Sequence, residues 1–178
     1  MTLLGIDFDN TIVRYDKLFH KLAVKKGLIQ NDFATCKIAI RDHLRERGMD
    51  REFTLLQGEA YGLKILEAEP AIGVLYTLKK LKNKGVKMAI VSHKTKHPYK
   101  GPQYKLQEKA VQWLEKYEFF KPNTLNWQMK DIHFEETKEN KFKKIQELKC
   151  DYFVDDLHEV VKAIKSKSTN TERLSTYQ

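Results

Sequence analysis

The chain has 178 residues, of which 41% are hydrophobic and 32% are charged, and its formal net charge is +9 at pH 7. This length fits one domain, with room for a small insertion, and is enough to bury a real core. The chain has no run of about 18 apolar residues, which argues against a membrane span, and no basic region followed by a long apolar stretch at its start. We therefore expect a cytoplasmic protein without membrane contact, and the positive charge favours an anionic partner.

The first 69 residues predict a short buried strand followed by helices. Residues 3–9 are mostly apolar and end in acidic side chains. Between residues 15 and 68, apolar residues recur at helical spacing in three stripes, and Gly27 and Gly48 are plausible helix ends. We therefore predict a small all-helical insertion over residues 15–69.

The pattern then changes to helices that alternate with strands. Pro70 opens a predicted helix that ends at Gly85, and residues 87–92 follow as a buried strand. The elements predicted further along are a polar loop over 93–103, a helix over 106–114, a strand over 132–134, a helix over 142–148, a strand over 152–154 and a helix over 160–164.

This alternation predicts an α/β fold, a Rossmann-like parallel sheet with helices on both faces. Residues 1–14 and 70–165 would form this α/β core domain, and the helical insertion would interrupt it. Residues 166–178 are rich in serine and threonine, so we expect a flexible tail there.

Oxygen-bearing side chains stand where three of the predicted strands end. Asp7 and Asp9 end the first strand, Ser92 ends the second, and Asp155 with Asp156 ends the last. In open α/β sheets, ligands bind beyond the carboxyl ends of the strands, so these side chains should meet in one crevice. Several carboxylates in one crevice repel each other unless a cation neutralises them. An all-oxygen ligand set of this kind suits Mg²⁺.

These motifs resemble those of the haloacid dehalogenase-like hydrolases. Gly5-Ile6-Asp7-Phe8-Asp9-Asn10-Thr11 is similar to the first motif of that family, and Ile90-Val91-Ser92 is similar to the second. Tyr152-Phe153-Val154-Asp155-Asp156 resembles the fourth motif in its Asp-Asp form. The third motif would be a lysine near the start of the preceding helix, and the helical insertion resembles the cap of the family.

The resemblance implies a phosphatase. Asp7 would attack phosphorus and form an aspartyl-phosphate, as a carboxylate nucleophile can. Asp9 would protonate the leaving oxygen and later deprotonate the attacking water. An acid at this second position resembles the phosphatases of the family, whereas its dehalogenases lack it.

The resemblance also implies how phosphate and metal are held. Ser92, with His93 beside it, would bind the phosphate oxygens, aided by neighbouring backbone amides. The ligands of Mg²⁺ would be Asp7, the backbone carbonyl of Asp9, Asp155 and Asp156.

Two lysines compete for the phosphate-facing role of the third motif. Phe142, Ile145 and Leu148 define the buried face of their helix, and both Lys138 and Lys141 point toward it. Lys138 lies closer to the helix start and therefore nearer the strand ends. We favour Lys138 and keep Lys141 as the alternative.

A basic segment after Ser92 bears on the substrate and has three interpretations. The segment from His93 to Lys109 holds five lysines and two tyrosines, namely Lys94, Lys96, Lys100, Lys105, Lys109, Tyr99 and Tyr104. It could be a solvated loop, a second anion contact or a surface for single-stranded nucleic acid. A helical cap favours a small phosphorylated metabolite, because a lid closes best over a compact molecule. A nucleotide or nucleic-acid-end phosphatase and a non-catalytic binding protein are the alternatives.

Overall fold

The structure is a computed structural model that describes residues 2–165, so the predicted tail 166–178 lies outside the described residues. The chain forms two compact units. The α/β unit comprises, among the described residues, 2–13, 70–95 and 117–165. The helical unit comprises Arg14–Glu69 and Lys96–Lys116. In residues 2–165 no helix combines the length and the apolar character needed to cross a membrane.

The α/β unit is built on a parallel sheet with the strand order β5-β4-β1-β6. Its strands are β1 (Leu3–Ile6), β4 (Lys87–His93), β5 (Ile132–Glu135) and β6 (Tyr152–Val154). The register places Gly5 of β1 between Ala89 of β4 and Phe153 of β6. A side chain at Gly5 would collide with the Phe153 ring, because its Cβ would lie 2.6 Å from a ring carbon. The predicted Rossmann-like parallel sheet is confirmed.

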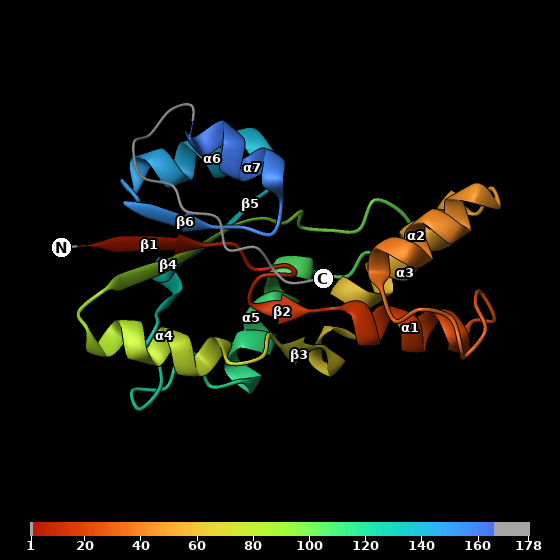
Figure 1. The fold of residues 1–178 in the computed structure, drawn as a ribbon, viewed down its shortest axis with the longest axis horizontal. Helices are drawn as coiled ribbons and strands as arrows, with labels where there is room; N and C mark the ends of the chain where they lie inside the picture. The colour runs from red at the N-terminus through yellow and green to blue at the C-terminus, as the bar shows by residue number, and fades with distance from the viewer. Residues whose placement is uncertain (1, 166–178) are drawn as a thin grey trace. The chain divides into compact units, whose positions relative to one another are not determined.

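Helices cover both faces of this sheet, as predicted. Figure 1 shows α6 (Lys138–Glu147) and α7 (His158–Lys165) on one side and α4 (Val74–Asn83) on the other. A short 3₁₀ helix, η2 (Met129–Asp131), precedes β5. The core on the α6 and α7 side contains Val91, Ile145, Phe153 and Val160, all nearly inaccessible to solvent. Each of these residues comes from a different strand or helix, so this core joins β4 and β6 to α6 and α7.

The start of α4 differs from the prediction, because Pro70 does not open this helix. Pro70 ends the short strand β3 (Glu69–Pro70), which pairs with β2 (Val13–Arg14). Gly73 precedes the helix with a φ of 74°, a left-handed conformation that interrupts any helix begun at Pro70. The fixed φ of proline suits an extended segment as well as a first helical turn, so the residue type alone could not decide.

The helical unit contains α1 (Asp16–Lys25), α2 (Lys37–Glu46), α3 (Asp50–Tyr61), α5 (Leu106–Lys116) and the 3₁₀ helix η1 (Ile65–Glu67). Its buried side chains include Phe19, Leu22, Ile40, Leu44, Phe53, Leu56, Ile65 and Trp113. Its connections to the α/β unit include β2 and β3, because the chain passes from one unit to the other within each of these strands.

The helical unit is larger than the predicted insertion 15–69, because it also takes in residues 96–116. Trp113 of α5 is fully buried and donates a hydrogen bond from Nε1 to the Ala68 carbonyl at 2.9 Å. The loop before α5 lies against two glycines, Gly58 within α3 and Gly62 at its end. A Cβ on Gly58 would be 3.0 Å from Pro98, and a Cβ on Gly62 would be 2.6 Å from Tyr104. That this unit acts as a cap stays a prediction.

Candidate active site

Asp7 and Asp9 stand in the turn that follows β1. The backbone N–H of Asp7 donates to the Val154 carbonyl at 2.9 Å, which carries the pairing of β1 with β6 one residue beyond the strand. Asn10 then adopts a φ of 61°, a left-handed conformation that asparagine tolerates better than most residues. The turn therefore holds Asp7 and Asp9 at the carboxyl edge of the sheet, where the sequence predicted them.

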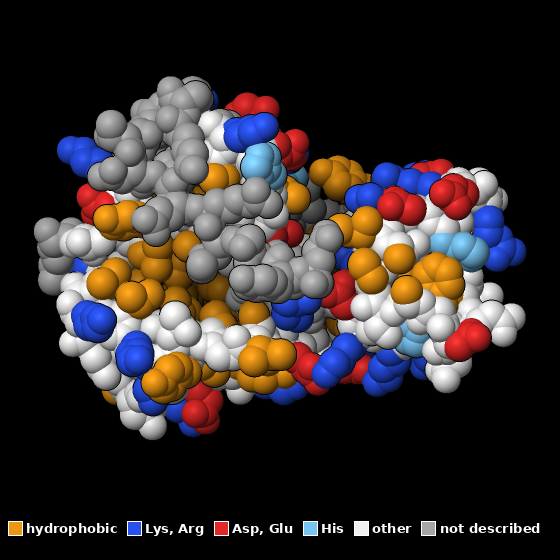
Figure 2. Space-filling view, viewed as in Figure 1, with side chains coloured by type: hydrophobic (Ala, Val, Ile, Leu, Met, Phe, Trp, Pro, Cys, Tyr) orange, Lys and Arg blue, Asp and Glu red, His pale blue; other side chains and the backbone are white. Residues whose placement is uncertain are grey.

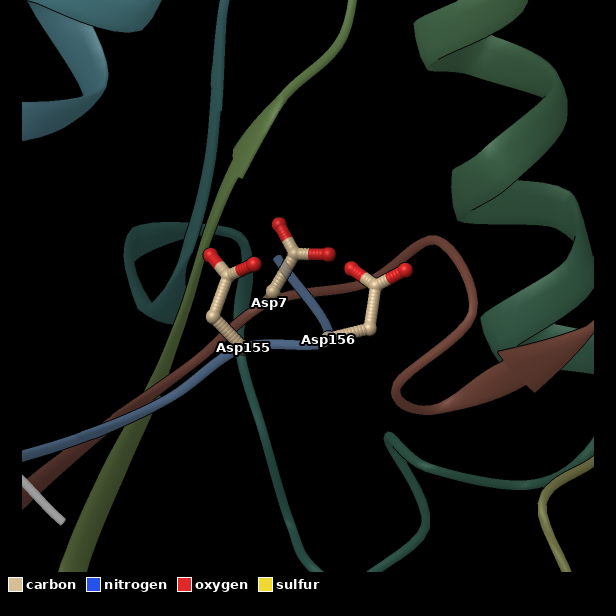
Figure 3. A group of neighbouring side chains, drawn as sticks. All are labelled: Asp7, Asp155 and Asp156. Carbon is tan, nitrogen blue, oxygen red and sulfur yellow. The ribbon is translucent and has the colours of Figure 1, made fainter. Parts of the chain in front are cut away.

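Asp155 and Asp156 come to the same place from the end of β6. One ligand oxygen from each of Asp7, Asp155 and Asp156 lies within 4.8 Å of the others. In Figure 3 the three carboxylate groups point to the same side of the backbone segments that follow β1 and β6. Asp7 and Asp155 are buried, and Asp155 is oriented by a 2.8 Å hydrogen bond from the Leu157 N–H to its Oδ1. The predicted convergence of strand ends thus holds for all three side chains.

Lys141 lies between two of these carboxylates. Its Nζ donates to Oδ1 of Asp7 and to Oδ2 of Asp155, each at 2.6 Å. Its side chain is only 3% exposed. Burial disfavours the charged ammonium, but the two carboxylates outweigh that effect and raise the pKa of Lys141. Lys141 therefore stays a cation within the acidic cluster.

Lys138 lies elsewhere, so the order in which we ranked the two lysines is reversed. Lys138 is exposed and forms an ion pair with Glu159. It is the first residue of α6, and side chains on a helix lean toward the N-terminus, so a side chain at this position extends off the end of the helix. Lys141, one turn deeper, reaches back along the buried face to Asp7.

Asp7 is in an electrostatically unfavourable position for a charged carboxylate. Burial, together with the neighbouring Asp155 charge and against the opposing effect of Lys141, raises the pKa of Asp7 to about 7. Carboxylates this close repel one another and keep their charge only if cations are near. One ammonium serves two buried carboxylates here, which leaves a negative site suited to a further cation.

Ser92 brings a hydroxyl to the end of the neighbouring strand. It lies on β4, is 1% exposed, and its Oγ has no hydrogen-bond partner among the described residues. A buried hydroxyl without a partner costs free energy, so such an atom points to a ligand. His93 lies differently, because neighbours along a strand face opposite ways. Its Nε2–H donates to the Glu136 carbonyl at 3.0 Å.

Lys94 is the residue that the sequence reasoning missed. We counted it in the basic loop, but the structure buries it to 3% exposure and pairs it with Asp9. Its Nζ lies 2.9 Å from both carboxylate oxygens of Asp9. A signal was available, since residues two apart on a strand share a face, and Lys94 follows Ser92 at that spacing.

The donor set fits a magnesium ion. Asp7, Asp155 and Asp156 offer oxygen atoms only, and hard carboxylate oxygens suit Mg²⁺ rather than softer metals. The unpartnered hydroxyl of Ser92 adds a donor suited to a phosphate oxygen. These residues could therefore hold a divalent cation and a phosphate group together.

Solved structures of hydrolases have a similar fold. A hydrolase from Streptococcus pneumoniae TIGR4 matches with a TM-score of 0.60 at 8% identity, covering 99% of this chain and 92% of that one. A HAD hydrolase, family IA, variant 3, from Entamoeba histolytica HM-1:IMSS matches with a TM-score of 0.55 at 12% identity, covering 98% of this chain and 83% of that one. Neither a model of a known protein family nor any curated protein sequence matches the chain.

At these identities the likeness concerns the fold. The chain has the fold of the haloacid dehalogenase-like hydrolases, as the resemblance of its motifs implied. Its activity has to be argued from the site itself.

Proposed function

We propose that this chain is a magnesium-dependent phosphatase that hydrolyses a phosphate monoester through an aspartyl-phosphate on Asp7. The observation that carries the proposal is the meeting of Asp7, Asp155 and Asp156 beside the ammonium of Lys141. The unpartnered hydroxyl of Ser92 supports it, and so does the hydrolase fold. Asp7, Asp155, Asp156 and the Asp9 carbonyl would hold Mg²⁺, which when bound shares the negative charge of the phosphoryl group.

The residues of the chain divide the reaction into two displacements. In the first, a carboxylate oxygen of Asp7 attacks phosphorus, the bond from phosphorus to the ester oxygen breaks, and Asp9 gives its proton to the departing alkoxide. In the second, Asp9 takes a proton from water while the water oxygen attacks phosphorus, and the bond to Asp7 breaks. The products are an alcohol and inorganic phosphate, and both aspartates return to their starting forms.

Lys141 and Ser92 would stabilise the phosphoryl group during transfer. The Lys141 ammonium already lies 2.6 Å from an oxygen of Asp7, so it stands beside the atom that attacks. The Ser92 hydroxyl can donate to a phosphate oxygen. Fixed donors aimed at developing charge usually provide the largest single contribution to such reactions.

For the substrate we propose a small phosphorylated metabolite. The helical unit shows mixed charge on the face seen in Figure 2, where basic side chains stand among acidic ones. Such a surface differs from the continuous basic groove that tracks a nucleic-acid backbone. One observation favours nucleotides or nucleic-acid ends instead, since Tyr99 is 79% exposed beside Lys100 and could stack on a base.

A substrate panel tests the proposal. Wild type and Asp7→Asn would be assayed, with Mg²⁺ and with a chelator, on small phosphate esters, nucleotides and phosphorylated oligonucleotides. We expect turnover that needs Mg²⁺ and falls by at least about 10⁴-fold in Asp7→Asn. Absence of metal-dependent turnover throughout the panel would favour a binding protein. A large preference for oligonucleotides that salt removes would favour nucleic-acid ends.

A further inference from the structure

Lys94 is a buried lysine to which the reaction above gives no role. It follows Ser92 at the spacing that puts two residues on one face of β4. Its own backbone N–H donates to the Glu135 carbonyl at 2.7 Å, so the pairing of β4 with β5 continues past the end of the strand. This hydrogen bond therefore fixes the backbone of Lys94 beside the end of β5.

The side chain of Lys94 forms an ion pair with Asp9. Its Nζ lies 2.9 Å from each Asp9 oxygen and 5.3 Å from the centre of the Phe8 ring, which is itself fully buried. The Lys94 side chain is 2% exposed and that of Asp9 is 20% exposed. A buried ammonium is stable only when a carboxylate compensates for its lost hydration. Contact with both oxygens holds the Asp9 carboxylate group at a fixed position beside Lys94.

The two buried lysines of the site thus serve different acids. Lys141 binds Asp7 and Asp155, whereas the hydrogen bonds of Lys94 described here go to Asp9. An acid–base group has to stand within hydrogen-bond reach of the oxygen it protonates, and a misplacement of about 1 Å can cost about 10²-fold in rate. Asp9 directly precedes a turn and is partly exposed, so it needs a fixed partner more than the buried Asp7 does.

We propose that Lys94 is a positioning residue for Asp9, which it aims at the leaving-group oxygen of a phosphate ester. This inference rests on the proposed function, because the orientation of Asp9 matters only if Asp9 is the acid and base. The competing role is direct binding of the substrate phosphate by Lys94. The two roles differ in what they do to esters with good and poor leaving groups, since protonation matters most when the leaving group is a poor one.

The test compares Lys94→Met with Lys87→Met. Lys87 is exposed at the first position of the same strand and is the matched control. Each variant would be assayed with Mg²⁺ on 4-nitrophenyl phosphate, which has a good leaving group, and on glycerol 2-phosphate, which has a poor one. We expect Lys94→Met to lose about tenfold in kcat on the first ester and about 10²–10³-fold on the second, with KM changed less than about threefold. Lys87→Met should match wild type on both.

Several outcomes would overturn the positioning role. Equal losses on the two esters, or a raised KM at unchanged kcat, would make Lys94 a substrate-binding residue. A Lys94→Met that matches wild type would leave Lys94 without a role. If Lys94→Met does not fold, Lys94→Gln keeps a donor, and its ratio of rates on the two esters should lie between those of wild type and Asp9→Asn. A Lys94→Gln ratio equal to that of wild type would count against the proposal.

The same assay separates this inference from the proposed function. If wild type hydrolyses neither ester nor any other phosphate in the panel, the phosphatase proposal fails and the role of Lys94 fails with it. If wild type is active and Asp9→Asn is impaired while Lys94→Met is not, only the positioning role fails.

Discussion

The α/β unit holds buried ion pairs beside exposed ones, whereas the helical unit offers clear examples of exposed pairs. In the α/β unit, Lys141 and Lys94 are at most 3% exposed and are surrounded by acids with which they form hydrogen bonds. In the helical unit, pairs such as Lys17 with Glu69 and Lys21 with Glu67 lie at the surface, where Lys17 is 77% exposed. The same residue types are thus used in two dielectric environments.

This comparison indicates which charged side chains have a functional role. An exposed pair gains little, because water screens it and two long side chains lose freedom. A buried pair is expensive to form, and a well-packed apolar replacement is often no less stable. Stability alone therefore gives little reason to bury lysines among aspartates, and the buried pairs mark the chemistry. The predictions below test this contrast from its largest expected effect to its smallest.

The largest effect should follow loss of Lys141. In Lys141→Met, Asp7 and Asp155 lose the ammonium that compensates them, so the free energy of unfolding without Mg²⁺ should fall by about 3–5 kcal/mol. The value of kcat/KM with Mg²⁺ should fall by about 10²–10³-fold or more. Urea unfolding in chelator and steady-state kinetics would measure the two effects.

A second substitution separates charge from packing at this position. If the cost of Lys141→Met comes from uncompensated carboxylates, adding Asp7→Asn should recover part of the lost stability, because one buried charge is then removed. Simple additivity of the two substitutions in urea unfolding would instead attribute the cost to the shape of the lysine side chain.

Magnesium should stabilise the α/β unit by binding the acidic cluster. A ligand at 100 times its Kd adds about 2.7 kcal/mol to the stability of the folded state, so Tm should rise as Mg²⁺ is added. Asp155→Asn should remove most of this rise, because Asp155 is buried in the cluster. Asp42→Asn, at an exposed carboxylate of α2, should keep it. An equal rise in both variants would place the ion elsewhere.

Loss of Lys138 should have a small effect. Its ion pair with Glu159 is exposed at both ends, 47% for the lysine and 65% for the glutamate. We expect Lys138→Met to keep kcat/KM within about threefold of wild type, since exposed pairs contribute little. A loss as large as that of Lys141→Met would instead favour Lys138 as the phosphate-facing lysine.

The sheet could be predicted from sequence because its strands are short, mostly apolar runs that end in polar residues. The strand ends then brought Asp7, Ser92 and Asp155 together by a general rule of parallel sheets. The choice between Lys138 and Lys141 could not be made this way. Periodicity gives the angle of a side chain around a helix, but it does not say how far the helix end stands from the strand ends.

Long-range packing explains the other differences between the predicted and the observed structure. Residues 106–114 predict a helix, but the pattern does not say which core that helix joins. Its place in the helical unit depends on Trp113 and on the two glycines, Gly58 and Gly62, whose missing side chains admit the loop before it. Burial of Lys94 is equally non-local, because it needs Asp9, 85 residues away in the chain.

The smallest effect concerns Glu67 and acid. Hydrogen bonds from Lys21 and Lys64 lower the pKa of Glu67 from 4.5 to about 2. A pKa lowered by folding contributes stability that is present above the unfolded value, near pH 4.5, and is lost as the pH falls toward 2. The Glu67 side chain is 35% exposed, so screening should keep this contribution below about 1 kcal/mol. Glu67→Gln should therefore be slightly less stable than wild type in urea at about pH 7, and the gap should narrow at about pH 3. Glu108→Gln, whose pair with Lys105 is 63% exposed at the glutamate, is the control and should match wild type at both values. If the difference in unfolding free energy between Glu67→Gln and wild type is the same in acid as at neutral pH, the Glu67 side chain acts through packing and not through its charge.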